Sequence, residues 1–127
     1  MYKNRYNLIC YNTYGGIDMN KYILDFLKDI MAIDSPSGYS KKVIHYCQKE
    51  AEKLGFQTKK THKGNLEIYV EGQDDYTVGF CGHVDTLGLM VRSIKSDGTL
   101  AFTNVGGPII PTLDGEYCRI HTRDGQC

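Results

Sequence analysis

A histidine and an aspartate stand two residues apart in the stretch Gly82-His83-Val84-Asp85-Thr86-Leu87-Gly88. The apolar run before it, residues 77–81, predicts a buried strand, so that both side chains would lie in a turn at its carboxyl end. Open α/β sheets place their ligands at such turns. A metal-bound histidine usually donates its other ring N–H to a carboxylate, which would give Asp85 a role beside a ligand at His83. The pair therefore predicts one corner of a metal site.

The same spacing arises readily by chance, because aspartate is a common residue and the chain contains four histidines. On the residues alone, a purely structural pair stays open. The other histidines add no ligand pattern: His45 lies in a predicted helix, His62 precedes a turn, and His121 is predicted on the solvent face of a late strand. None forms an HExxH or HxxxH pair. Cys81 is predicted to be a buried strand cysteine rather than a soft second ligand.

Other kinds of catalytic site are not supported by the sequence. Three serines surround Gly38 without forming a GxSxG motif. The Gly106-Gly107 pair belongs to no GxGxxG motif, and no P-loop lysine follows it. A glycosidase would need two facing carboxylates, and the acidic residues are scattered with no such pair. Metal chemistry is therefore the chemistry that the residues favour.

The composition is that of an ordinary globular protein, with 127 residues, 41% hydrophobic and 24% charged. The net charge is zero. Without a basic stripe or a polybasic run, neither a nucleic-acid partner nor a membrane partner is expected. The five cysteines are irregularly spaced and contain no CxxC pair, which predicts a reduced, cytoplasmic protein. No run of about 18 apolar residues predicts a spanning helix.

Two amphipathic helices are predicted in the first half of the chain. The first has Asn20 as its N-cap and ends where Pro36 and Gly38 break the pattern. Its apolar residues recur at helical spacing and are Ile23, Phe26, Leu27, Ile30 and Met31. The second is capped by Ser40 and ends before Gly55, which suits the C′ position. Its apolar face comprises Val43, Ile44, Cys47, Ala51 and Leu54.

Strands joined by short turns are predicted after Gly55. The expected strands cover residues 56–61, 66–70, 77–81, 89–94, 100–102 and 117–121. Lys63-Gly64-Asn65 and Ser96-Asp97-Gly98 are the strongest turn signals between them. This order predicts the α/β class, with an α/β layer up to about Leu87 and the start of a separate β domain afterwards.

Three segments are expected on this basis. Residues 1–18 are rich in tyrosine and asparagine, and they form either a leader or upstream extension before Met19, or an ordinary N-terminal arm. Residues 19–87 form the first α/β segment, and residues 88–127 open the β domain. The chain ends at Cys127 in a turn, where a return strand is expected, so a truncated chain is predicted.

Several short motifs follow one another from Asn20 to Cys127. In chain order they are Ser35-Pro36-Ser37-Gly38-Tyr39, Lys63-Gly64-Asn65-Leu66, the stretch from His83 to Val91, Ile94 with Asp97-Gly98, Gly106-Gly107, and the stretch from Tyr117 to Gly125. In order and spacing they resemble the N-terminal third of the glutamyl and deblocking aminopeptidases. Residues 1–18 match nothing in that family.

The resemblance implies a cocatalytic dinuclear metallopeptidase that acts on peptides with two divalent metal ions, zinc or cobalt. It implies a zinc-peptidase-like α/β domain with an inserted β-barrel domain for dimerisation, and dimers that assemble to a dodecamer. By motif, His83 corresponds to a ligand of one metal and Asp85 to the carboxylate that holds this histidine. The family's other ligands and its general-base glutamate would follow Cys127, so this chain is expected to be inactive alone.

Two alternatives stay open beside the aminopeptidase reading. One is a non-catalytic remnant that serves as an interaction module through its β-domain edge. The other is a small α/β binding protein in which the His83–Asp85 pair is structural.

Overall fold

The computed structural model describes residues 13–14 and 17–127, and these residues fall into two compact units. The first unit contains the chain up to residue 34 and residues 41–84, and the second contains residues 35–40 and 85–127. The short loop between the two helices therefore belongs to the second unit, whereas the helices on either side of it belong to the first.

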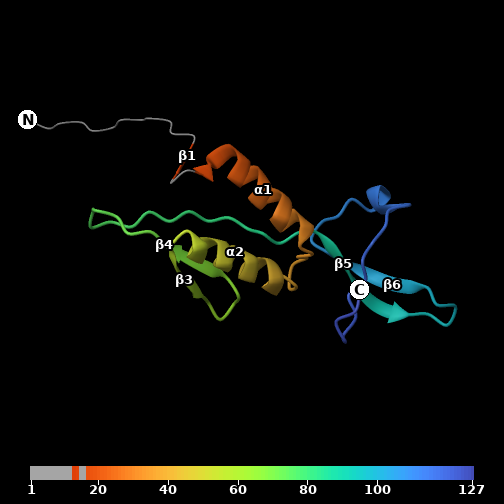
Figure 1. Cartoon of the computed structure of the whole chain (residues 1–127). Helices are drawn as coiled ribbons and strands as arrows, with labels where there is room; N and C mark the ends of the chain where they lie inside the picture. Colours follow the sequence, from red (N-terminus) through yellow and green to blue (C-terminus); the bar gives the residue numbers. More distant parts are fainter. Residues whose placement is uncertain (1–12, 15–16) are drawn as a thin grey trace, which may run out of the picture. The chain divides into compact units, whose positions relative to one another are not determined.

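The first unit consists of two helices and short antiparallel hairpins (Figure 1). In chain order its elements are β1 (Thr13–Tyr14), β2 (Ile17–Asp18), α1 (Met19–Ala32), α2 (Lys41–Lys53), β3 (Gln57–Lys60) and β4 (Leu66–Tyr69). Strands β1 and β2 pair with each other, and β3 pairs with β4 in a register that places Thr58 opposite Ile68. Both predicted helices are present, and the hairpin around Gly64 is confirmed.

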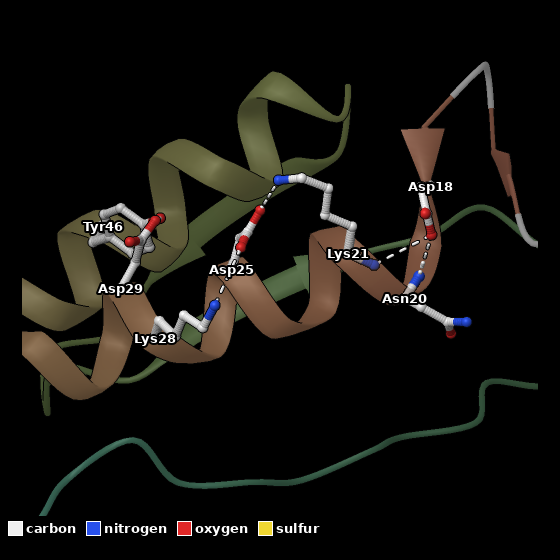
Figure 2. Close-up of polar contacts among 7 residues, drawn as sticks. All are labelled: Asp18, Asn20, Lys21, Asp25, Lys28, Asp29 and Tyr46. Atoms are coloured by element: carbon white, nitrogen blue, oxygen red, sulfur yellow. Dashed lines mark hydrogen bonds and ion pairs between the residues drawn. The ribbon is translucent and has the colours of Figure 1, made fainter.

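Helix α1 begins two residues earlier than predicted, because Asp18 and not Asn20 caps it. The Asp18 carboxylate accepts hydrogen bonds from the backbone N–H groups of Asn20 and Lys21, at 3.1 and 3.2 Å (Figure 2). Asp18 is therefore the N-cap, and the prediction of Asn20 was wrong. Both residue types cap helices well. Asp18 is the cap because its side-chain oxygen lies within hydrogen-bonding distance of the first free amides of the helix.

Helix α2 ends in a Schellman motif. Gly55 has a φ of +86°, its N–H donates to Glu52 O at 3.0 Å, and the N–H of Phe56 donates to Ala51 O at 3.0 Å. These two bonds satisfy carbonyls that the last turn would otherwise leave without partners. The predicted glycine stop is confirmed, and it directs the chain into β3.

The core of the first unit lies along α2. Val43 is fully buried and Ala51 nearly so, and both belong to the predicted apolar face. The face predicted for α1 is less covered, because Leu27 is 49% exposed and Met31 66% exposed. Among the described residues of this unit, burial is therefore concentrated on the second helix.

The two helices also meet through aromatic and polar side chains. The rings of Phe26 and Tyr46 stack with centroids 5.9 Å apart. The Tyr46 hydroxyl donates to Asp29 Oδ2 at 2.6 Å, as Figure 2 shows. This hydrogen bond to a carboxylate raises the pKa of Tyr46. On the outer surface of α1, hydrogen bonding to Lys21 lowers the pKa of the Asp25 carboxyl.

The second unit is built on one hairpin (Figure 1). Strand β5 (Gly88–Ile94) pairs antiparallel with β6 (Leu100–Val105), with Val91 opposite Phe102 and a register shift next to Ser93. The predicted Ser96-Asp97-Gly98 turn is confirmed, with Gly98 at a φ of +85°. A short 3₁₀ helix, η1 (Ile110–Leu113), follows and was not predicted.

Two predicted strands are absent. Residues 77–81 and 117–121 form neither helix nor strand, and Phe80 and Tyr117 are almost completely exposed. Residues 77–81 were expected to be buried, so that prediction was wrong in both respects. A strand needs a neighbour for its backbone N–H and C=O groups. Among the described residues, no segment pairs with either stretch in a ladder.

The coarse class is therefore a small α/β chain with two helices followed by hairpins. None of the helices in the described residues is long and apolar enough to cross a membrane. The predicted leader lies mostly in residues 1–12 and 15–16, outside the described residues.

Candidate functional site

His83 and Asp85 lie in a stretch without regular secondary structure, and not at the end of a strand. Residues 81–85 form no regular element, and the first pairing occurs at Thr86. His83 is exposed and Asp85 is half-buried. His83 belongs to the first unit and Asp85 to the second, so the predicted pair spans the point where the chain passes between them.

The Asp85 carboxylate has a specific partner in the loop between the helices. The hydroxyl of Ser37 donates a hydrogen bond to Asp85 Oδ2 at 2.5 Å. A hydrogen bond from a hydroxyl to a carboxylate is a stronger contact than a bond between neutral groups. Asp85 is thus anchored by a residue 48 positions earlier in the chain.

The backbone next to Asp85 is held by the same loop. The N–H of Thr86 donates to Ser35 O at 2.8 Å, and Pro36 and Thr86 form a parallel bridge. Ser35 is fully buried. One backbone pairing and one side-chain hydrogen bond therefore join the loop to the stretch that contains Asp85.

The loop owes its shape to a tight turn. The N–H of Tyr39 donates to Pro36 O at 2.7 Å, and Gly38 has a φ of +86°. Glycine at the third position of such a turn allows this positive φ without strain. Pro36 also lies against Gly88, where a Cβ would be only 2.6 Å from the proline Cβ. The turn and this close contact fix where Ser37 is presented.

The Tyr39 side chain connects the loop to a residue near the end of the chain, His121. Its ring lies against the imidazole of His121, with centroids 5.0 Å apart and planes tilted by 32°. His121 is half-buried and lies outside any strand. The prediction that it occupies the solvent face of a strand was therefore wrong.

The remaining predicted candidates lie apart from this arrangement. His45 is exposed on α2, as predicted, and His62 is exposed in the turn after β3. Cys81 is exposed, which contradicts its prediction as a buried strand cysteine. Within residues 13–14 and 17–127, no three His, Cys, Asp or Glu side chains come together to hold a metal ion. A catalytic zinc usually takes three protein ligands and a water. The donor set described here therefore does not fit a complete metal centre.

Ser37 is the residue of this region that sequence reasoning did not single out. It stood only within the Ser35-Pro36-Ser37-Gly38-Tyr39 motif, which predicted a turn. Nothing local indicated that its hydroxyl would meet a carboxylate 48 positions away. A covarying pair would have been the signal for such a contact, and one sequence contains none.

His83 and Asp85 lie in a segment that matches a known family of proteins. The family model described as M42 glutamyl aminopeptidase matches residues 64–127, half of the chain, and this range includes His83 and Asp85. The class of protein defined by the match is a metallo-aminopeptidase family whose members use two metal ions. The chain belongs to the M42 glutamyl aminopeptidase family, as the motifs predicted.

Individual relatives support the same assignment. The chain is 36% identical over 104 residues to the protein YhfE of Bacillus subtilis (strain 168), which covers 81% of this chain and 30% of YhfE. It is 26% identical over 106 residues to the glutamyl aminopeptidase of Lactococcus lactis subsp. cremoris (strain MG1363), covering 82% of this chain and 30% of that enzyme. The chain therefore spans about 30% of the length of these curated relatives.

Proposed function

We propose that this chain forms part of a metal-dependent aminopeptidase that removes N-terminal residues from short peptides. The observation that supports the proposal most directly is the family match over residues 64–127, which contains His83 and Asp85. The similarity to a glutamyl aminopeptidase supports a peptide substrate. In this proposal residues 19–87 begin the zinc-peptidase-like α/β domain, and residues 88–127 begin an inserted β-barrel domain.

In this proposal His83 is a ligand of one metal ion and Asp85 orients its imidazole. A ligating histidine usually gives its second ring N–H to a carboxylate, which fixes the tautomer and the ring orientation. The two divalent ions of the family, zinc or cobalt, would supply an activated water and polarise the scissile carbonyl. In the part of the chain that the structure describes, no three His, Cys, Asp or Glu side chains come together, so this proposal requires further ligands beside His83.

The 127-residue chain alone is accordingly proposed to be inactive. One imidazole cannot replace the usual three protein ligands of a catalytic zinc. We further propose that the complete enzyme is a cytoplasmic homo-oligomer, with dimers that assemble to a dodecamer. The proposed compartment rests on the sequence alone, in which the cysteines are irregularly spaced and form no CxxC pair.

A chimera tests this function. Residues 20–127 would replace the aligned segment of the B. subtilis relative, and the product would be assayed with zinc or cobalt on amino-acid p-nitroanilides. We expect metal-dependent hydrolysis by the chimera and none by the 127-residue chain. The His83→Ala chimera should lose activity and bind less metal per protein, measured by atomic absorption. The His45→Ala chimera is the matched control, because His45 is an exposed histidine on α2.

Two results would contradict the proposal. One is an unchanged metal content and activity in the His83→Ala chimera. The other is a folded wild-type chimera that binds no metal and cleaves no peptide, which would favour a binding module with a structural His83–Asp85 pair.

A further inference from the structure

We propose that Ser37 is a positioning residue, which holds the Asp85 carboxylate in one orientation through the 2.5 Å hydrogen bond to Oδ2. The loop between the two helices would then set the orientation of the carboxylate that orients the His83 imidazole. This last consequence rests on the proposed function, which gives Asp85 its role beside His83. The Ser37–Asp85 hydrogen bond is independent of the proposed function.

A half-exposed aspartate has two soft side-chain torsions, and its carboxylate can rotate among several orientations. The hydrogen bond from the Ser37 hydroxyl to Oδ2 favours one of these orientations. The bond from Ser37 involves a charged acceptor, so it is stronger than a bond between neutral groups.

The loop presents the Ser37 hydroxyl from a backbone that is held on both sides. Before Ser37, the carbonyl of Ser35 accepts from the N–H of Thr86 at 2.8 Å. After it, the turn closed by Tyr39 N–H to Pro36 O at 2.7 Å fixes the direction of the chain. A hydroxyl on a freely moving loop would lose most of the bond's value to ordering entropy. Here the backbone contacts have already ordered the loop.

Two further contacts place the loop within the second unit. Gly88 approaches Pro36 so closely that a Cβ there would lie 2.6 Å from the proline Cβ. The ring of Tyr39 lies on His121, with centroids 5.0 Å apart. These contacts do not involve the Ser37 hydroxyl, so removing that hydroxyl should leave the loop in place. A positioning role can therefore be separated from a structural one.

The test on the chain itself measures the side-chain torsion of Asp85. Two kinds of three-bond NMR coupling report whether Asp85 populates one χ1 rotamer. One joins its α proton to its β protons, and the other joins its backbone nitrogen to its side-chain carboxyl carbon. We expect one rotamer in the wild type and in Ser37→Thr, which keeps the hydroxyl, and averaged couplings in Ser37→Ala. Ser96→Ala, at an exposed serine in the turn after β5, is the matched control and should match the wild type.

Hydrogen exchange of the Thr86 amide shows whether the loop remains docked. We expect Ser37→Ala to keep the Thr86 protection of the wild type while its Asp85 couplings average. Couplings that stay those of a single rotamer in Ser37→Ala would overturn the proposal. If Ser37→Ala lost both the Thr86 protection and the single Asp85 rotamer, the proposal would also be overturned. The role of Ser37 would then be to hold the loop in place and not to orient the carboxylate.

The chimera gives a second, functional readout that does not depend on how the short chain behaves. There Ser37→Ala should weaken metal binding by about tenfold, near the lower end of what loss of a ligand's hydrogen-bonding partner costs. It should lower kcat more than it raises KM, and Ser37→Thr should restore both. Unchanged metal affinity and kcat in Ser37→Ala would count against a positioning role. An inactive wild-type chimera would instead contradict the proposed function, while the Asp85 couplings would still decide the role of Ser37.

Discussion

Gly88 and Pro36 are in direct contact across the second unit, and no side chain larger than hydrogen fits at Gly88. A Cβ built on Gly88 lies 2.6 Å from the Cβ of Pro36 and 3.4 Å from its Cγ. Both atoms belong to a proline ring, which cannot rotate away as a flexible side chain would. Gly88, the first residue of β5, can therefore approach the loop this closely only because it has no side chain.

Gly88→Ala should destabilise the second unit by about 1–3 kcal/mol, the usual cost of overpacking. Urea unfolding followed by the amide signals of β5 and β6 would measure it. Gly107→Ala is the matched control, because a Cβ there meets nothing within 4 Å. Equal midpoints for the two glycine variants would contradict the close contact.

Asp18→Ala should lower the stability of α1 by about 1 kcal/mol, because it removes the oxygen that accepts from two free amides of the first turn. Asp18→Asn should retain most of that stability, since its side-chain carbonyl accepts equally well. Helical signal at 222 nm during thermal unfolding is the measurement. Asn20→Ala discriminates between the two caps: a larger loss there than in Asp18→Ala would restore the assignment made from sequence.

Tyr46→Phe should lower the free energy of unfolding by about 1 kcal/mol near neutral pH, because one hydrogen bond to a carboxylate is lost at a partly exposed site. The bond to Asp29 raises the pKa of Tyr46 above its ordinary value. Its contribution is therefore fully present below about pH 10 and declines above it, because the unfolded tyrosine loses its proton first.

Urea unfolding of the wild type and Tyr46→Phe at about pH 7 and about pH 11 measures this dependence. The difference between the two proteins should shrink at the higher pH. Tyr76→Phe serves as the control, since Tyr76 is 72% exposed. A wild-type advantage that grows with pH would contradict the role of the phenol as donor.

Tyr39→Ala should release the His121 ring from its aromatic neighbour. We expect the imidazole proton signals of His121 to move toward the shifts of an exposed histidine, and the second unit to lose about 0.5–1.5 kcal/mol. Tyr39→Phe keeps the ring and should keep both properties. Proton–carbon NMR correlation of the histidine ring is the measurement, and an unmoved His121 signal in Tyr39→Ala would exclude the contact in solution.

Local signals explain which elements were predictable. The helices follow from apolar spacing within about two turns and from a glycine at position 55, and the β5–β6 hairpin follows from Ser96-Asp97-Gly98. The failures concern long-range partners. Residues 77–81 have the composition of a strand, but in the described residues no neighbour pairs with them. An apolar run specifies that a strand can form, whereas pairing decides whether it does.

The candidate site divides along the same line. His83 and Asp85 were identified because they lie two residues apart. Ser37 was not, because its contact with Asp85 depends on a backbone pairing between Ser35 and Thr86 that no local pattern encodes. The motif Ser35-Pro36-Ser37-Gly38-Tyr39 includes Ser37 but does not indicate which residue its side chain contacts.

The assignment of residues 35–40 to the second unit has a consequence for the order of folding. The loop leaves the ribosome before the helix that follows it and well before residues 85–88. It can find its partners only after about fifty further residues, and closing such a loop costs about 3 kcal/mol of chain entropy. The helical hairpin can form first from local contacts. The two units alternate along the chain, so no single cut would yield both of them whole. Neither unit can therefore be produced as a continuous segment of this chain.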